Sequence, residues 1–144
     1  MLSPSLEDYL EEVYRLSLNN KEIRIKDIAD CLQVSMPSVV KGLKRLHNQG
    51  YIVYRPYQRI EVLDKGKKKG KFLIERNKIL REFVKIIGSD CDIKQEAEAM
   101  EHYFSVSTIK AIEKLVKFLK ERDDVLNDFK SFKIQSIIDD NIST

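Results

Sequence analysis

Apolar residues recur at intervals of three and four near the start of the chain, which is the spacing of one buried helix face. Ser3 is a favourable N-cap and Pro4 suits the first helical position, so this pattern predicts a first helix over about residues 4–17. The apolar positions of the predicted helix are Leu6, Leu10, Val13, Tyr14 and Leu16.

Two further helices are predicted before residue 51. A short extended piece at Ile23 and Ile25 is expected to lead into the first of them, and Cys31, which falls among its apolar positions, is expected to be buried. Ser35 is expected to cap the second helix after a tight turn, and Gly50 to end it. The buried side of this second helix is predicted to consist of Val39, Val40, Leu43 and Leu46.

The next segment, residues 51–63, is rich in β-branched and aromatic residues with polar residues in its middle, and it predicts a two-stranded hairpin. Asp64 is expected to cap a long helix that starts with a lysine-rich turn and closes at Gly88. Three shorter helices are predicted beyond it, over about residues 94–104, 105–119 and 126–138, and residues 139–144 are expected to fray.

Helix, short strand, helix, turn, helix and hairpin follow one another in the order of a winged helix-turn-helix. We therefore expect a mostly α fold with a winged-helix DNA-binding domain over residues 1–72. Residues 73–144 are expected to form a long linking helix and an all-helical metal-binding and dimerisation domain. The alternative is a winged helix used only for protein contacts. The expected DNA-binding residues are Ser35, Pro37, Ser38, Lys41 and Lys44 on the recognition helix and Arg55, Tyr57 and Arg59 on the wing.

The charge of the chain supports a nucleic-acid partner. The net charge is only +3, but residues 21–81 hold sixteen Lys and Arg against six acids, whereas residues 1–20 and 82–144 are acidic overall. A basic middle between acidic ends is typical of a module that binds a polyanion, and double-stranded operator DNA is the expected partner. A lysine-rich solvated surface is the alternative interpretation.

Two groups of potential metal ligands are far apart in the sequence. Asp8 and Glu11 are three residues apart in the first predicted helix, and Glu98, Glu101 and His102 fall within one turn of a later one. Carboxylates with one imidazole suit Mn²⁺, and Fe²⁺ is the second choice. The alternatives are that the first pair serves the helix dipole and that the later group is an exposed acidic helix face.

Several functional classes are excluded or disfavoured. With two histidines and no glycine-rich phosphate loop, the sequence predicts no enzyme. No apolar run reaches the ~20 residues of a membrane span, and the acidic N-terminus is unlike a signal peptide, so no membrane partner and a cytoplasmic location are expected. The apolar positions of the helix at 105–119 need a partner surface and predict a homodimer; they are Ile109, Ile112, Leu115, Val116 and Leu119.

Four blocks together carry a family resemblance through their order and spacing. They are SPSLEDYLEEVYRL, IKDIADCLQVSMPSVVKGLKRLHNQGYIVY, LDKGKKKGKFLIERNKIL and EAEAMEHYFS. Over roughly residues 3–120 the chain resembles the diphtheria toxin repressor family, in its manganese transport regulator branch. The resemblance implies a homodimer in which Mn²⁺ or Fe²⁺ binds between a winged helix and a helical dimerisation lobe.

The resemblance also implies residue roles, with two departures. Asp8, Glu11, Glu98, Glu101 and His102 match the family's metal ligands, and a glutamate at position 98 is typical of the manganese branch. Asn77 stands where the family has a histidine ligand, and its amide oxygen carries no charge. In the wing, Gln58 and Arg59 replace the usual glycine after an arginine.

Three hypotheses follow. The first is a Mn²⁺- or Fe²⁺-dependent transcriptional repressor of metal-uptake genes that binds a palindromic operator as a dimer. The second is a winged-helix DNA-binding regulator with a degenerate or altered metal site, which Asn77 favours. The third is an assembly protein whose affinity for DNA is incidental.

Overall fold

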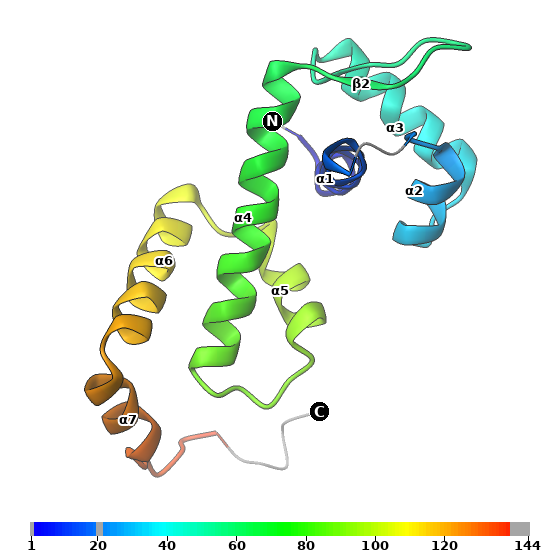
Figure 1. Ribbon diagram of the computed structural model, residues 1–144. Helices are drawn as coiled ribbons and strands as arrows, with labels where there is room; N and C mark the ends of the chain where they lie inside the picture. Colours follow the sequence, from blue (N-terminus) through cyan, green and yellow to red (C-terminus); the bar gives the residue numbers. More distant parts are fainter. Residues whose placement is uncertain (1, 20–21, 139–144) are drawn as a thin grey trace. The chain divides into compact units, whose positions relative to one another are not determined.

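The computed structural model describes residues 2–19 and 22–138, and in these residues it contains seven helices and one two-stranded sheet (Figure 1). The chain divides into two compact units, Met1–Lys78 and Ile79–Thr144, which are described separately below. The predicted mostly α architecture with a small hairpin is confirmed. No helix in the described part of the chain is both long and apolar enough to cross a bilayer. The expected fraying of residues 139–144 lies outside the described residues.

Helix α1 (Pro4–Leu18) begins where its sequence predicts. The hydroxyl of Ser3 accepts a hydrogen bond from the Leu6 amide at 3.3 Å, so one of the unpaired donors of the first turn is satisfied. Leu10 and Val13 are fully buried, and α1 packs against the two helices that follow it and against the second strand of the hairpin.

Helices α2 (Ile25–Leu32) and α3 (Met36–Asn48) follow. The expected extended piece at Ile23 and Ile25 is wrong in part, because Arg24 has the extended backbone of an N-cap and Ile25 already begins α2. The expectation that Cys31 is buried is also wrong. The inward side of α2 is filled by Ile28 and Ala29 instead.

The hairpin and the start of the long helix complete the first unit. Strands β1 (Ile52–Val53) and β2 (Glu61–Val62) pair antiparallel, with Ile52 opposite Val62, and the loop between them reaches beyond the helices of this unit (Figure 1). Helix α4 (Asp64–Ile86) starts at Asp64 itself rather than after it, and its residues to Lys78 belong to the first unit. The largest fully buried side chains of this unit are Leu10, Ile28, Leu43, Leu46, Ile52 and Leu73.

The second unit comprises the end of α4 with helices α5 (Ile93–Glu101), α6 (Val106–Glu121) and α7 (Asp123–Ser131). The helix predicted over 126–138 is displaced. It begins at Asp123, because two aspartates in its first turn suit the helix dipole, and it ends where Phe132 turns to an extended backbone. Leu80, Ala97 and Ile109 form the small core of this unit.

The apolar face predicted to need a partner is largely used inside the second unit. Ile109, Val116 and Leu119 are buried in this unit, whereas Leu115 is 44% exposed. The large apolar side chains that α6 exposes are therefore fewer than the sequence indicated. They are Val106, Leu115 and Phe118.

We expect Gly66→Ala to lower the free energy of unfolding by about 1–3 kcal/mol, although alanine is the better helix former. A Cβ at Gly66 would overlap the carbonyl oxygen of Tyr51, a backbone atom that cannot rotate away. Urea unfolding followed by circular dichroism measures the effect. Lys67→Ala, at an exposed neighbouring position of α4, is the control and should change stability by less than ~0.5 kcal/mol. Equal midpoints for the two variants would contradict this account.

Candidate functional site

The exposed side of α3 carries most of the predicted DNA-binding residues. Ser35 caps the helix, since its hydroxyl accepts from the Ser38 amide at 3.3 Å and lies 2.8 Å from the Ser38 hydroxyl. Lys41 and Lys44 are exposed, whereas Leu43 is fully buried. The buried face therefore fixes the helix in the unit. Its exposed face, with Ser38 followed by Lys41 and Lys44, can contact a partner.

The wing presents a second basic group. Arg55, Tyr57 and Arg59 all lie in the loop between β1 and β2, and all are exposed. Pro56 and Tyr57 occupy the two central positions of a tight turn in which the Gln58 amide donates to the Arg55 carbonyl at 3.3 Å. The turn therefore holds the loop in a narrow tip, with an arginine on each side of it.

Side chains that the sequence did not single out attach the wing to the helices. The Tyr54 amide donates to Nδ1 of His47 at 3.1 Å, so this histidine joins the last turn of α3 to the residue that follows β1. Lys65 at the start of α4 donates to the Gln49 carbonyl at 2.7 Å, with its ammonium 4.2 Å from the centre of the Tyr51 ring. These contacts fix the recognition helix and the wing as one surface.

Asp8 and Glu11 lie one turn apart on α1, and both are half-buried. The residue beside them is more deeply placed: Glu7 is 8% exposed. Its carboxylate lies 3.3 Å from the Lys69 ammonium and 3.4 Å from a guanidinium nitrogen of Arg76, both on α4.

The Glu7 network joins α1 to α4 within the first unit. Arg76 is 5% exposed, and its guanidinium also lies 5.6 Å from the centre of the Phe72 ring. Charges that are this deeply buried are retained only when they are paired. Sequence reasoning missed the network, because nothing in the spacing of Glu7 among the other acids of α1 distinguishes it; only its position between the apolar Leu6 and Leu10 hinted at burial.

Asn77 follows Arg76 on α4 and is itself buried. The position that departs from the family pattern is therefore shielded from solvent. A polar side chain in such a place requires hydrogen-bonding partners, and Asn77 has interactions within the protein. It offers an amide oxygen where the family has an imidazole nitrogen.

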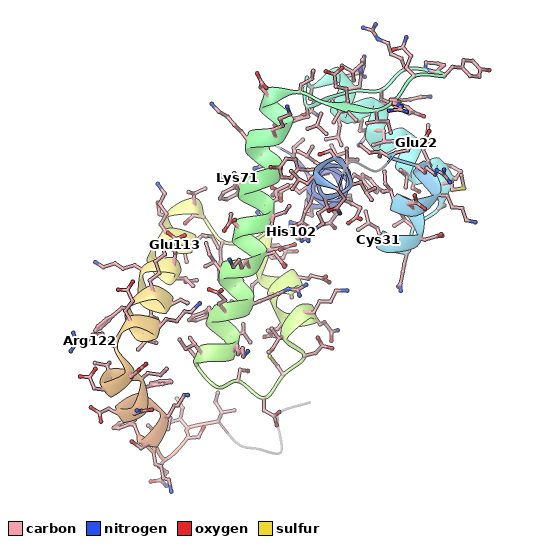
Figure 2. All side chains as sticks on the ribbon, in the orientation of Figure 1. Glu22, Cys31, Lys71, His102, Glu113 and Arg122 are labelled. Carbon is pink, nitrogen blue, oxygen red and sulfur yellow. The ribbon has the colours of Figure 1, made fainter. Side chains whose placement is uncertain are left out.

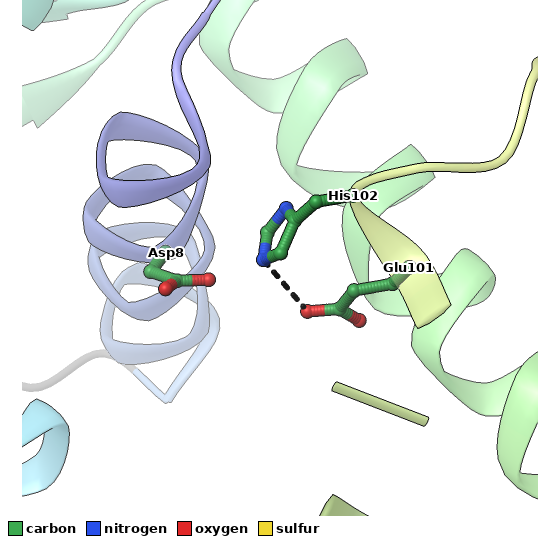
Figure 3. A group of neighbouring side chains, drawn as sticks. All are labelled: Asp8, Glu101 and His102. Carbon is green, nitrogen blue, oxygen red and sulfur yellow. Dashed lines mark ion pairs between the residues drawn. The ribbon is translucent and has the colours of Figure 1, made fainter. Parts of the chain in front are cut away.

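The remaining predicted ligands lie at the end of α5 in the second unit. Helix α5 ends at Glu101, and His102 is its C-cap with a backbone that is still right-handed helical. Glu101 is 3% exposed, and its Oε1 lies 3.5 Å from Nε2 of His102. Figure 3 shows this pair joined by a dashed line.

The predicted helix over 94–104 is thus too long by three residues at its end, yet Glu101 and His102 remain neighbours. Glu98 lies one turn before Glu101 on α5 but is exposed. Figure 2 labels His102 in the second unit and Cys31 in the first, where Cys31 is exposed. Within the second unit, Glu101 and His102 are therefore brought together, and Glu98 is left at the surface.

Comparison with known protein families gives two adjacent matches that cover most of the chain. Residues 1–60 match the model described as iron dependent repressor, N-terminal DNA binding domain. Residues 63–129 match the model described as iron dependent repressor, metal binding and dimerisation domain.

Two curated relatives are similar over nearly their whole length. The HTH-type transcriptional regulator MntR of Lysinibacillus sphaericus (strain C3-41) is 36% identical over 136 residues, 94% of this chain and 98% of the relative. The protein of the same name in Bacillus subtilis (strain 168) is 37% identical over 134 residues, 92% of this chain and 94% of the relative.

Solved structures with the same fold include the manganese regulator SloR, with a TM-score of 0.71 and 25% identity over 81% of this chain. A second is ScaR with bound Zn²⁺, with a TM-score of 0.65 and 28% identity over 78% of this chain. This chain spans little more than half the length of either structure, 55% and 54% respectively.

We expect Arg76→Met to lower the free energy of unfolding by about 3 kcal/mol, because it leaves the buried Glu7 carboxylate without its guanidinium partner. Glu7→Met should be comparably harmful, and the double variant should be less destabilised than the sum of the two. A double-mutant cycle by urea unfolding measures the coupling. Glu22→Met, in the exposed pair with Arg24, is the control and should cost below ~1 kcal/mol. Additive effects of Glu7→Met and Arg76→Met would contradict the assignment.

Proposed function

Because the chain belongs to the iron-dependent repressor family of HTH-type transcriptional regulators, we propose that it represses metal-uptake genes by binding palindromic operator DNA as a Mn²⁺-loaded homodimer. The expectation that the chain is no enzyme is confirmed, since these relatives are transcriptional regulators. For the same reason the assembly-protein hypothesis is wrong. A repressor acts where its operator is, so the proposed location is the cytoplasm.

The observation that carries the metal dependence is the buried carboxylate of Glu101 beside His102. The pair places a carboxylate oxygen and an imidazole nitrogen, two donor types that bind divalent metal ions, 3.5 Å apart. Carboxylate oxygens are hard donors, and one imidazole nitrogen adds preference for a transition metal over Mg²⁺. This donor set fits Mn²⁺, with Fe²⁺ as the second choice.

We propose that Asp8 and Glu11 of the first unit complete the site with Glu98, Glu101 and His102 of the second. Asp8, Glu101 and His102 each offer one atom suited to a metal ion. Manganese is favoured because two MntR proteins are close relatives and because a structural neighbour is titled a manganese regulator. The exposed Glu98 turns inward when it takes part.

The bound divalent cation would supply positive charge that removes the repulsion among these carboxylates. In this proposal α1 carries two ligands on the DNA-binding unit, and α5 with its C-cap His102 carries the others on the second unit. Joining them restricts how the DNA-binding unit moves, and operator DNA binds the restricted arrangement better. By reciprocity, operator DNA tightens metal binding by the same factor.

The DNA-binding role rests on residues 1–72, which we propose act as one domain. Ser35, Pro37 and Ser38 at the start of α3 would contact base edges in the major groove. Arg59 and the other basic residues would bind phosphates and set the register. The phosphate contacts from this helix and the wing are assigned to Lys41, Lys44, Arg55 and Arg59.

Residues 73–144 are proposed to hold the dimer, as the name of the matching family model implies. The apolar side chains left exposed on α6 and α7 offer a surface for it, although it is smaller than the sequence predicted. These side chains are Val106, Leu115, Phe118 and Phe129. A two-fold dimer presents two recognition helices and so fits a palindromic operator.

A second candidate function is a DNA-binding regulator that does not respond to metal, and Asn77 is the observation that favours it. The buried amide offers an oxygen in place of an imidazole nitrogen, and an amide oxygen has less affinity for transition metals. The two candidates share the DNA interface and differ only in their response to metal.

Removing metal separates the two candidates. With Mn²⁺, the wild type should bind the duplex it enriches from a random-sequence library about 5- to 150-fold more tightly than in chelator. Glu101→Ala and His102→Ala should abolish this difference while keeping the circular dichroism spectrum, and Asn77→His should raise Mn²⁺ affinity. Glu121→Ala, an exposed acid on α6, is the control. Equal affinity of the wild type with Mn²⁺ and with chelator would favour the metal-independent regulator.

Salt dependence tests the DNA interface independently of metal. Each phosphate contact contributes about −0.9 to the slope of log affinity against log salt, so Lys41→Ala should make the slope less steep by roughly that amount. Lys117→Ala, at an exposed position of α6, should leave the slope unchanged. Fluorescence anisotropy of the labelled duplex at several salt concentrations gives both slopes. A slope unaffected by Lys41→Ala would remove α3 from the DNA interface.

A further inference from the structure

The tip of the wing has an unusual backbone. Tyr57 has a φ of +61°, in the left-handed region that tyrosine rarely adopts. It follows Pro56 in a turn closed by the hydrogen bond from the Gln58 amide to the Arg55 carbonyl, which is the pattern of a type II turn. The third position of such a turn favours glycine or asparagine, so the tyrosine destabilises the turn it occupies.

The Tyr57 side chain gains nothing from the protein in return. Its exposure is 108% of the reference value, so neither face of the ring packs against any residue that the structure describes. Gln33, the other described non-glycine residue with positive φ, differs: it is the C-cap of α2, and its amide donates to the Ala29 carbonyl. The left-handed backbone at Gln33 serves the fold, whereas at Tyr57 it only presents a ring.

The surroundings of the ring indicate what it meets. Arg55 and Arg59 lie two residues to either side of Tyr57, and both are exposed. The loop is fixed to α3 through the His47 to Tyr54 hydrogen bond, so ring and recognition helix belong to one surface. An exposed aromatic side chain flanked in the sequence by two exposed arginines, in a loop attached to α3, suits a nucleic-acid groove with its negative potential.

We propose that Tyr57 enters the minor groove of the operator beside the half-site that α3 reads, an inference that rests on the proposed DNA-binding function. The groove is about 6 Å wide, which admits one side chain but not the hairpin. The ring faces would contact deoxyribose, and the hydroxyl would donate to adenine N3 or thymine O2. The exocyclic amino group of guanine obstructs that approach, so A·T pairs at this point are favoured.

The test uses three variants in the full-length, Mn²⁺-loaded protein. Tyr57→Gly and Tyr57→Asn both suit the left-handed backbone but lack the ring, whereas Tyr57→Phe keeps the ring without the hydroxyl. The probe is the duplex that the wild type enriches from a random-sequence library, made with A·T or G·C pairs flanking each half-site. Affinity is measured by fluorescence anisotropy and stability by urea unfolding.

Tyr57→Gly and Tyr57→Asn should bind the A·T-flanked duplex about fivefold or more weakly than the wild type, while their stability is unchanged or higher. Both should also lose the preference for A·T flanks. Tyr57→Phe should retain most of the affinity and lose part of the preference. The variants without the ring would thus bind DNA more weakly although they are at least as stable as the wild type. A folding defect would instead lower DNA affinity and stability together.

The inference would be overturned if Tyr57→Gly and Tyr57→Asn bound the duplex with either flank as tightly as the wild type does. That result would leave the proposed function intact, because the wild type would still bind the duplex. Failure of the wild type itself to enrich any duplex with Mn²⁺ would instead overturn the proposed function. A loss of affinity that is equal for both flanks would remove the minor-groove assignment and leave Tyr57 as a phosphate-side contact.

Discussion

The buried ion pair between Glu7 and Arg76 is the interaction on which the rest of the first unit depends. It holds α1 against α4 with two oppositely charged side chains that are 8% and 5% exposed, and Lys69 adds a second cation to the same carboxylate. Two charges removed from water at this depth are stable only together. The pair therefore fixes the helix that carries Asp8 and Glu11 without help from a metal, and any metal response acts on a preformed unit.

On the proposed DNA-binding side, the exposed side chains of α3 and the wing contribute little to the stability of the fold. Structural contacts fix α3 and the wing from behind, through His47 to Tyr54 and through Lys65 to Gln49. The outward side chains contribute little to the fold, and the left-handed Tyr57 opposes it. A residue that is unfavourable for the fold and fully exposed is expected where a partner supplies the missing contacts.

Much of the fold could be predicted from the sequence, because the signals were local. Ser3 and Ser35 identified the starts of α1 and α3 correctly, since a hydroxyl accepting from an amide three residues on needs no tertiary context. The predicted limits of α7 and the predicted burial of Cys31 were wrong, because burial depends on which face of a short helix its neighbours cover.

The candidate site was predicted unevenly for the same reason. The adjacent Glu101 and His102 could be found from their spacing. Glu7, however, resembles every other acid on α1 until Arg76, 69 residues away in the sequence, is placed beside it. The backbone of Tyr57 was equally hidden, because a proline followed by tyrosine does not indicate a left-handed conformation.

The central claim is that one divalent cation couples the DNA-binding unit to the second unit, and distances between the units test it most directly. The chain carries two cysteines, exposed Cys31 in the first unit and half-buried Cys91 in the second, which can hold a donor and an acceptor dye. Single-molecule energy transfer is measured in dimers with one labelled protomer. The account predicts a broad distribution in chelator that narrows with Mn²⁺, and no narrowing in Glu101→Ala. Identical distributions with and without Mn²⁺, in a protein whose operator affinity still rises with the metal, would contradict it.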